Sequence, residues 1–527
     1  MESLSGQEDE SAQDRRDSTR LPHPTEGRPS LPAAIATSSR VPTLIRNTGW
    51  SLLALTAPLI AAVVAIPVMI SGLGVDRFGV LTLAWALVGY FNLFDFGLGR
   101  ALTQQVAAAL GTPAQANIAR LFWTFVWATL ALGTLGGLMV AVGSPWLVRS
   151  LLGVGPDLQQ EAQASLLVLA LGLPFSVVTP GLRGLLEAHM RFDLAAAVRA
   201  PTNVAVVVAP VAVLLFTPSL IAVMAALVVA RVAGAVLHIW VCRKVSDGVR
   251  RPARPDRVSA RTLASTGGWM TISNIASPLM AYGDRFVVGA AVSVAAAAYY
   301  ATPFDVITKV ALVPLAFASV LFPAFATSHG KDAEATIGMM VRTTQGLLLF
   351  IMPIILVVMA FAPELMRLWL EDAFAEAGTP VLKILTVGVL LNALAHIPLS
   401  YLQGVGRSDL VARLHLIELP IYFPLLLLLV REGGIEGAAF AWTARSGAEA
   451  VIVLFLSARA ATMAPGAAVS SALGIVAGVV AAVAMATIPG TVALRAVVLS
   501  CFLGTLAAIA MRWFSHAALT RTSGAPS

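Results

Sequence analysis

Apolar residues fill the chain in long stretches, separated by short polar segments. From Leu44 onward, mostly apolar stretches of about 20 residues recur, and each is long enough to cross about 30 Å of hydrocarbon as a helix. The pattern predicts an all-α polytopic membrane protein with about fourteen transmembrane helices. The predicted spans are 50–73, 78–99, 121–143, 162–182, 194–216, 218–241, 264–290, 299–325, 345–363, 379–402, 411–430, 434–457, 467–487 and 491–513.

Composition supports this class and excludes several others. Of 527 residues, 58% are hydrophobic and 12% are charged, about half the charge typical of a soluble chain. The two cysteines exclude a disulfide framework, and no cysteine and histidine cluster has zinc spacing. The sequence also has no glycine-rich phosphate loop. We therefore expect no metal, no cofactor and no enzymatic activity.

Loop charges predict the orientation of the chain. With the N-terminus inside, about 25 of the 35 Lys and Arg residues fall on cytoplasmic segments and about five on outside loops. This bias places both termini on the cytoplasmic side of the membrane. It also accounts for the net charge of +7, so nucleic-acid binding is not expected.

The spans divide into two similar groups of six. Both groups open alike, with Gly49-Trp50 before Pro58-Leu59 and Gly268-Trp269 before Pro278-Leu279. Six helices give both halves the same orientation, which is typical of parallel repeats in transporters. Chance likeness between Ala- and Leu-rich helices is the alternative. The predicted domains are a disordered cytoplasmic tail at 1–40, a six-helix bundle at 41–241, a basic cytoplasmic linker at 242–262, a second six-helix bundle at 263–460, and two further helices with a short tail at 461–527.

Charged residues inside the predicted spans are the candidate site. A charge at the bilayer centre costs about 2.5–3.5 kcal/mol on insertion scales, so such residues normally face protein or water. A cationic site among them would suit an anionic headgroup, with Arg as a forked phosphate ligand and Lys as a point charge. The predicted substrate-binding residues are Arg285, Lys309, Asp284, Asp305, Asp95 and Arg100.

Structural roles are the alternatives for several intramembrane charges. Residues four apart on one helix can neutralise each other, and long basic side chains can reach the membrane surface. The alternatives are pairing of Asp305 with Lys309 and of Arg445 with Glu449, snorkelling of Arg231, hydrogen bonding of Glu418 to backbone freed by Pro420, and core packing of His396.

Several loose motifs, taken in order, resemble the polysaccharide-export flippases of the multidrug/oligosaccharidyl-lipid/polysaccharide (MOP) superfamily. The resemblance covers most of residues 41–457. Its motifs are Gly49, Asp95, Gly97 and Gly99 in the first hairpin, Asp284-Arg285-Phe286-Val287-Val288-Gly289 followed by Tyr299-Tyr300, Pro314 to Phe322-Pro323, Tyr401-Leu402-Gln403-Gly404-Val405-Gly406-Arg407, and Gly437-Ala438-Ala439.

The resemblance implies two six-helix bundles around a central cavity, plus two C-terminal helices. It implies that a polyprenyl-diphosphate-linked oligosaccharide is moved from the cytoplasmic to the outer leaflet. Polysaccharide polymerase and export proteins are the candidate protein partners, beside the lipid bilayer. It offers no invariant catalytic residue to transfer. The rival functions are a cation-coupled multidrug antiporter of the same superfamily, a membrane glycosyltransferase or polymerase, and a structural scaffold.

Overall fold

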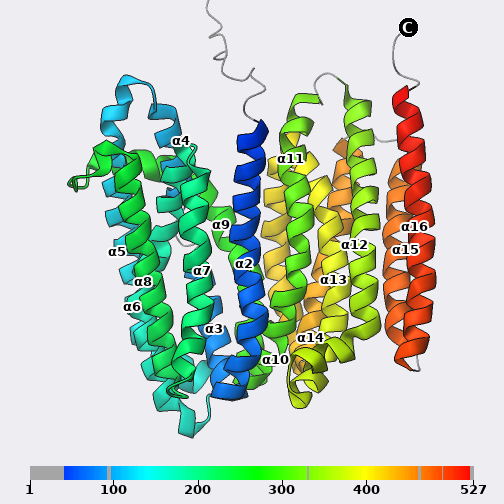
Figure 1. The fold of residues 1–527 in the computed structure, drawn as a ribbon, viewed down its shortest axis with the longest axis horizontal. Helices are drawn as coiled ribbons and strands as arrows, with labels where there is room; N and C mark the ends of the chain where they lie inside the picture. Colours follow the sequence, from blue (N-terminus) through cyan, green and yellow to red (C-terminus); the bar gives the residue numbers. More distant parts are fainter. Residues whose placement is uncertain (1–40, 92–96, 329–331, 461–464, 489–490, 523–527) are drawn as a thin grey trace, which may run out of the picture. The chain divides into compact units, whose positions relative to one another are not determined.

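The computed structural model describes residues 41–91, 97–328, 332–460, 465–488 and 491–522, and all its regular elements there are helices (Figure 1). The chain divides into two compact units, Met1–Trp50 and Ser51–Ser527. In the first unit, the described residues 41–50 form the start of helix α2. The packing reported below lies within the second unit. The predicted tail at 1–40 lies outside the described residues.

Within the described residues, the first half of the chain contains seven α-helices. Helix α5 ends in a π-helical turn at Leu147–Leu151, and several of the other helices contain internal prolines. The helices are α2 (Val41–Leu73), α3 (Val75–Phe91), α4 (Leu98–Ala109), α5 (Ile118–Trp146), α6 (Pro156–Ala188), α7 (Phe192–Leu214) and α8 (Leu220–Val245).

The basic segment after α8 leads into the second half. Helix α9 is capped by Asp256, whose side chain accepts a hydrogen bond from the Ser259 backbone N–H, and this bond lowers the pKa of that carboxyl. The helices are α9 (Arg257–Ala291), α10 (Val294–Ile307), α11 (Leu312–Ser328), α12 (Ala333–Trp369), α13 (Asp372–Gly404), α14 (Ser408–Ala460), α15 (Pro465–Thr487) and α16 (Val492–Thr522).

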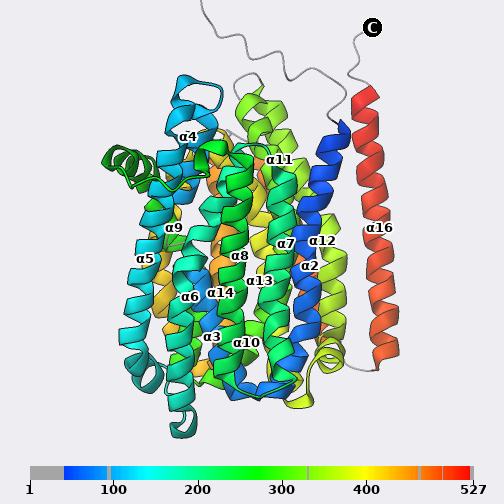
Figure 2. The same ribbon diagram turned by 60° about the vertical axis from the view of Figure 1, so that its left-hand side comes forward.

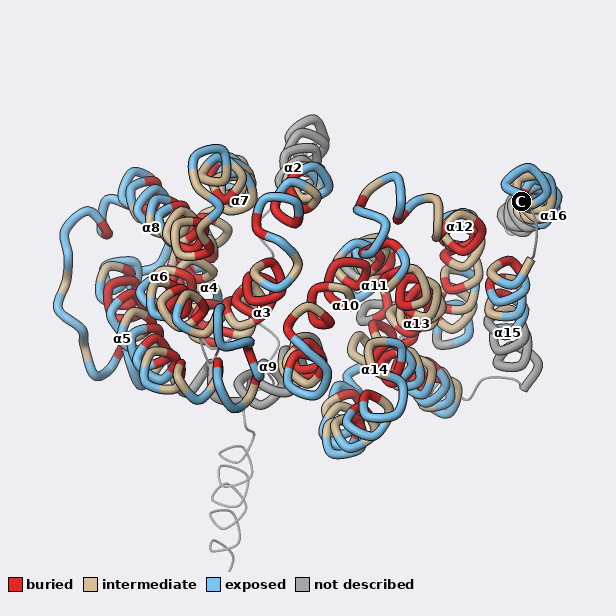
Figure 3. Tube along the Cα trace, turned by 90° about the horizontal axis from the view of Figure 1, so that it is seen from below, coloured by how far each residue is buried: buried red, intermediate tan, exposed pale blue. Residues whose placement is uncertain are grey.

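The helices pack mainly within their own half. Helices α5, α6, α7 and α8 gather on one side, and α11, α12, α13 and α14 on the other (Figure 3), whereas the two groups overlap in the view of Figure 2. Contacts between the halves involve α3 with α9 and α10, and α9 with α4 and α5. Helices α15 and α16 pack against α12, at the edge of the second half (Figure 3).

A glycine allows the two halves to approach closely. A Cβ atom at Gly79 of α3 would lie 2.2 Å from the backbone oxygen of Val294, the first residue of α10. Since this distance is far below van der Waals contact, any other residue would push α3 away from α10. The spacing between the halves at this point therefore depends on the absence of a side chain.

The structure changes the boundaries of several predicted spans. The predicted helix at 299–325 is broken, because a 3₁₀ turn at Thr308–Ala311 separates α10 from α11. The predicted helices at 411–430 and 434–457 are confirmed as two helical segments of α14, which are separated by a reversal at Gly434 with φ 55° and ψ −132°. Within the described residues, ten helices are long and apolar enough to cross a membrane. One of these ten, α14, contains two predicted spans. The prediction of an all-helical membrane protein with many spans therefore agrees with this fold.

Candidate functional site

Asp284 and Arg285 form a buried polar cluster where α9 meets α10. Asp284 is 0% exposed and Arg285 is 3% exposed. The Tyr300 hydroxyl of α10 donates a hydrogen bond to Asp284 Oδ2 at 2.6 Å. Helix packing thus brings together groups that lie 16 residues apart in the sequence.

Arg285 is held by a carboxylate of α10. Its Nη1 and Nη2 atoms donate to Oδ2 and Oδ1 of Asp305 at 3.2 and 2.5 Å, which is a forked ion pair. The rings of Tyr282 and Phe304 lie 5.6 and 5.5 Å from the guanidinium carbon. The protein itself therefore balances the charge of Arg285.

Lys309 lies one turn beyond Asp305 and has a different environment. It is exposed, it belongs to the 3₁₀ turn, and within the described residues it makes no ion pair. The alternative in which Asp305 and Lys309 neutralise each other is therefore wrong. The physical reason is that Asp305 pairs across to Arg285, while the α-helix ends at Ile307 before Lys309 is reached.

These side chains line a cavity of about 900 Å³, which we call the C-half cavity. Helices α9, α10, α11, α13 and α14 supply most of its lining, and α4 contributes Arg100. Four predicted site residues line this cavity: Arg100, Arg285, Asp305 and Lys309. Asp284 does not line it, and Asp95 lies outside the described residues.

A second ion-pair cluster borders the C-half cavity on α14. Arg445 Nη1 lies 3.3 Å from Glu449 Oε2 and 3.5 Å from Glu418 Oε2. His415 Nε2 lies 3.6 Å from the other oxygen of Glu449. The pairing of Arg445 with Glu449 is confirmed. The alternative for Glu418 is wrong, because its oxygens make no hydrogen bond within the described residues and it pairs with Arg445.

The remaining alternatives concern His396 and Arg231. His396 lines the C-half cavity, and its Nδ1 lies 2.9 Å from the backbone oxygen of Asn392. Arg231 Nη1 donates to Ser176 Oγ at 3.3 Å inside the first half. The snorkelling of Arg231 to the surface is therefore wrong, because its side chain is held within the protein by α6.

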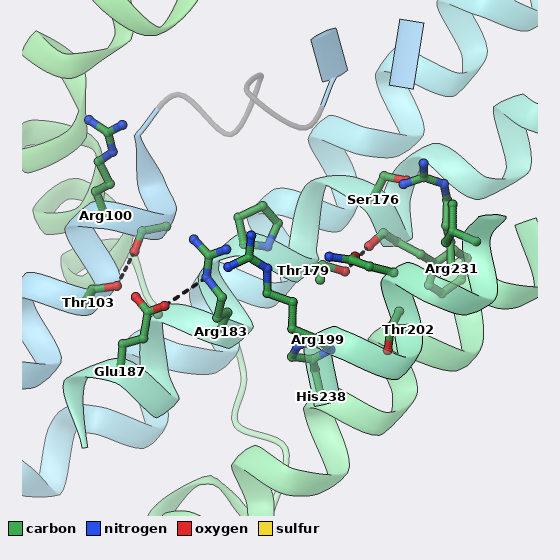
Figure 4. Close-up of a pocket in the computed structure, with 16 residues that line it drawn as sticks. Arg100, Thr103, Ser176, Thr179, Arg183, Glu187, Arg199, Thr202, Arg231 and His238 are labelled. Carbon is green, nitrogen blue, oxygen red and sulfur yellow. Dashed lines mark hydrogen bonds and ion pairs between the residues drawn. The ribbon is translucent and has the colours of Figure 1, made fainter. Parts of the chain in front are cut away.

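The first half contains a separate cavity of about 420 Å³, which we call the N-half arginine cavity (Figure 4). Its lining comes from α4, α6, α7 and α8. The basic side chains there are Arg100, Arg183, Arg199 and Arg231. Among the described residues, Glu187 is the one acidic residue in this lining, and it pairs with Arg183. The described lining of this cavity therefore holds four arginines and one glutamate.

Sequence reasoning missed Arg183 and Arg199 as site residues. Both were assigned to the cytoplasmic side because they fall at or near the inner ends of the predicted spans 162–182 and 194–216. The sequence offered one signal, because Arg183 and Arg199 lie near the two ends of the short connection between these neighbouring spans. In the structure, α6 extends beyond the predicted span to Ala188, so Arg183 lies on a helix rather than in a loop. Arg199 lies on α7, near the inner end of the predicted span 194–216.

A third cavity, of about 450 Å³, is mostly apolar. Residues of α2, α3 and α7 line it, such as Leu59, Trp85 and Val207. We call it the apolar cavity. It adjoins the other two, because Arg231 also lines the N-half arginine cavity and Arg285 also lines the C-half cavity. The three cavities are therefore neighbours within the second unit.

Comparison with known proteins identifies the class. The model of the polysaccharide biosynthesis protein family matches residues 72–379. A putative O-antigen transporter of Shigella flexneri is 27% identical over 419 residues, which are 79% of this chain and 98% of that protein.

Solved structures show the same fold at low sequence identity. An inward-facing multidrug resistance MATE family transporter of the MOP superfamily has a TM-score of 0.68 and 16% identity, and the match covers 78% of this chain and 98% of that chain. The lipid II flippase MurJ, in an inward closed conformation, has a TM-score of 0.64 and 11% identity, covering 88% and 98%. The resemblance to MOP transporters found in the sequence is confirmed. The chain belongs to the polysaccharide biosynthesis protein family, is a multi-pass membrane protein, and shares its fold with these transporters.

Proposed function

We propose that the protein flips a polyprenyl-diphosphate-linked oligosaccharide from the cytoplasmic to the outer leaflet of the inner membrane. The observation that carries this proposal is the charge around the three adjoining cavities. The basic lining residues are Arg100, Arg183, Arg199, Arg231, Arg285, Lys309 and Arg445, and the acidic ones are Glu187, Asp305 and Glu449. This excess of positive charge favours an anionic headgroup.

The same charge balance disfavours transport of organic cations. A cation site in a low-dielectric cavity needs unpaired carboxylates, because a buried charge is costly without a partner. Here Asp305 pairs with Arg285, Glu187 with Arg183 and Glu449 with Arg445. The paired state of these acids supports the flippase over the multidrug antiporter.

The proposed mechanism is alternating access of the two six-helix halves, 41–241 and 263–460. Lys309, which is exposed and has no ion-pair partner among the described residues, attracts the diphosphate on entry together with Arg285. Asp305 holds the Arg285 guanidinium while the cavity is empty, and Asp284 Oδ1 accepts a hydrogen bond from the Arg285 backbone N–H. The C-half cavity takes the sugars, and the polyprenyl chain stays in lipid beside the apolar cavity.

The membrane potential favours this direction of movement. A potential of 100 mV contributes about 2.3 kcal/mol for each elementary charge moved, so a diphosphate with about two charges gains about 4–5 kcal/mol on leaving a negative interior. The basic loops support a cytoplasmic location for both termini. Polysaccharide polymerase and export proteins are the partners that this function implies.

Lipid profiling of a deletion strain tests the proposal. We expect the strain to accumulate one complete polyprenyl-diphosphate-linked repeat unit, measured by mass spectrometry of lipid extracts. Wild-type protein removes the accumulated lipid, while Arg285→Ala and Lys309→Ala, present at normal membrane levels, do not. Arg413→Ala is the matched control, since Arg413 is an exposed arginine that lines none of the three cavities.

Three outcomes would count against the proposal. An unchanged lipid profile with new sensitivity to cationic dyes would favour the antiporter. Accumulation of an incomplete unit would point to a glycosyltransferase. Full transport by both Arg285→Ala and Lys309→Ala would remove these two residues from the site.

A further inference from the structure

We infer that the N-half arginine cavity is the site that holds the diphosphate group of the lipid-linked substrate. The choice of substrate rests on the proposed function, whereas the anion site rests on the geometry of α4, α6, α7 and α8. Sequence analysis assigned no binding role to Arg183, Arg199 or Arg231.

The first argument is that this cavity has unbalanced positive charge. Arg183 Nε lies 3.0 Å from Glu187 Oε1, one turn away on α6. Within the described residues, Arg199 and Arg231 have no carboxylate partner, and Arg231 Nε is buried without any hydrogen-bond partner. A buried donor without a partner is costly, so the site favours an added acceptor.

The second argument is the position of like charges. The guanidinium groups of Arg183 and Arg199 point toward one another in the cavity (Figure 4), and their positive charges repel each other. Like charges that face each other are unfavourable unless an anion lies between them. A phosphate group there would relieve the repulsion and accept hydrogen bonds from both side chains.

The third argument is the chemistry of the available donors. The hydroxyls of Thr103, Thr179 and Thr202 already donate to backbone oxygens at 2.7–2.9 Å. The strongest remaining donors are therefore guanidinium groups, whose planar fork suits phosphate oxygens. The lining favours a multiply charged oxyanion over a neutral sugar.

The fourth argument is the order of the three cavities. In a lipid-linked sugar, the diphosphate lies between the hydrocarbon chain and the sugars. The N-half arginine cavity meets the apolar cavity at Val206 and Arg231, and it meets the polar C-half cavity at Arg100. The apolar cavity and the C-half cavity also adjoin each other, since Arg285, Asp305 and Lys309 line both. An anion in the N-half arginine cavity would therefore lie next to both an apolar space and a polar one, as the substrate requires.

Arg285 is less suited to hold the anion. Its two terminal nitrogens are engaged by Asp305, so a phosphate would have to displace a carboxylate that is already in forked geometry. In the N-half arginine cavity, Arg199 and Arg231 offer donors without such competition. This difference supports two separate roles: Lys309 attracts the diphosphate on entry, and the N-half arginine cavity holds it.

Ligand binding to the full-length protein in detergent micelles tests the inference. The probes are inorganic pyrophosphate, farnesyl diphosphate and farnesol, with binding followed by microscale thermophoresis. We expect farnesyl diphosphate to bind at least tenfold more tightly than pyrophosphate, and farnesol to bind weakly. Arg199→Gln and Arg231→Gln should each raise the Kd for farnesyl diphosphate at least tenfold, and Arg199→Lys should recover part of this loss.

The controls separate binding from folding and from the proposed function. Arg413→Gln should leave the Kd unchanged, and the thermal unfolding midpoint of each variant shows whether it is folded. Unchanged affinity in folded Arg199→Gln and Arg231→Gln would overturn the anion site. Equal affinity for pyrophosphate and farnesyl diphosphate would overturn the lipid assignment, leaving free phosphate as the ligand. A third outcome separates the two proposals. If Arg199→Gln and Arg231→Gln lose affinity for farnesyl diphosphate but the deletion strain accumulates no lipid, only the proposed function is refuted.

Discussion

The two halves of the transporter treat buried arginines in opposite ways. In the second half, Arg285 is paired with Asp305, and Arg445 with Glu449 and Glu418. In the first half, the described lining of the N-half arginine cavity holds four arginines and one acidic residue, Glu187. An arginine that is paired with a carboxylate is part of the protein's own structure, whereas an arginine without such a partner is available to a ligand. The same residue type therefore predicts different roles in the two halves.

Loss of the unbalanced arginines should have the largest effect on transport. The double variant Arg199→Gln/Arg231→Gln should lower transport about 100-fold, because each hydrogen bond to a charged group contributes about 1.5–3 kcal/mol. Its stability should stay near that of the wild type, since no carboxylate is left without a partner. Clearance of the accumulated lipid in the deletion strain measures the first effect, and the unfolding midpoint measures the second. A strongly destabilised double variant would show that these arginines are structural.

Breaking a balanced pair should instead affect stability. Asp305→Asn leaves the buried Arg285 charge uncompensated and should lower the free energy of unfolding by about 3 kcal/mol. Arg285→Met should cost less, about 1 kcal/mol, because the Asp305 side chain is 38% exposed and can be hydrated. Unfolding in mixed micelles provides the measurement.

The double variant Arg285→Met/Asp305→Leu is the control for this pair. Replacing a buried pair by apolar residues of similar volume is often neutral, so this variant should be more stable than Asp305→Asn. If Asp305→Asn unfolds like the wild type, Arg285 has another partner and the contrast between the halves is weaker than the structure indicates.

Substitution of Glu187, the acidic residue in the described lining of the N-half arginine cavity, should increase the difference in charge balance between the two halves. Glu187 competes with a bound anion for Arg183, so Glu187→Gln should lower the Kd for farnesyl diphosphate by about three- to tenfold at low salt. The gain should shrink as ionic strength rises. The same titration with Glu161→Gln is a suitable comparison, because Glu161 pairs with Arg77 and lines none of the three cavities. Weaker binding by Glu187→Gln would contradict the proposed anion site.

Much of the fold could be predicted because apolar length is a local property of the sequence. The spans, the helical class and the pairing of Arg445 with Glu449 all follow from spacing along one helix. The break between α10 and α11 was less accessible, because a 3₁₀ turn at Thr308 depends on the surrounding helices.

The site was only partly predictable for the same reason. Arg285 and Asp305 were found as unusual charges, but their pairing requires α9 to lie beside α10, which spacing does not reveal. Arg183 resembled an ordinary cytoplasmic charge because α6 extends farther than the apolar pattern, and Arg199 did so because it lies near the inner end of its predicted span. Identifying a cavity of arginines therefore needed the packing of four helices.

The smallest expected effect is at Glu449, where Arg445 has two acidic partners. Glu449→Gln leaves Glu418 at 3.5 Å from Arg445 Nη1, and a glutamine oxygen can still accept a hydrogen bond. The cost in free energy of unfolding should therefore be below about 1 kcal/mol, against about 3 kcal/mol for Asp305→Asn. The double variant Glu418→Gln/Glu449→Gln removes both partners and should cost more than the sum of the single variants. Additive losses would mean that each glutamate acts alone, and that charge in the second half is balanced pair by pair rather than shared.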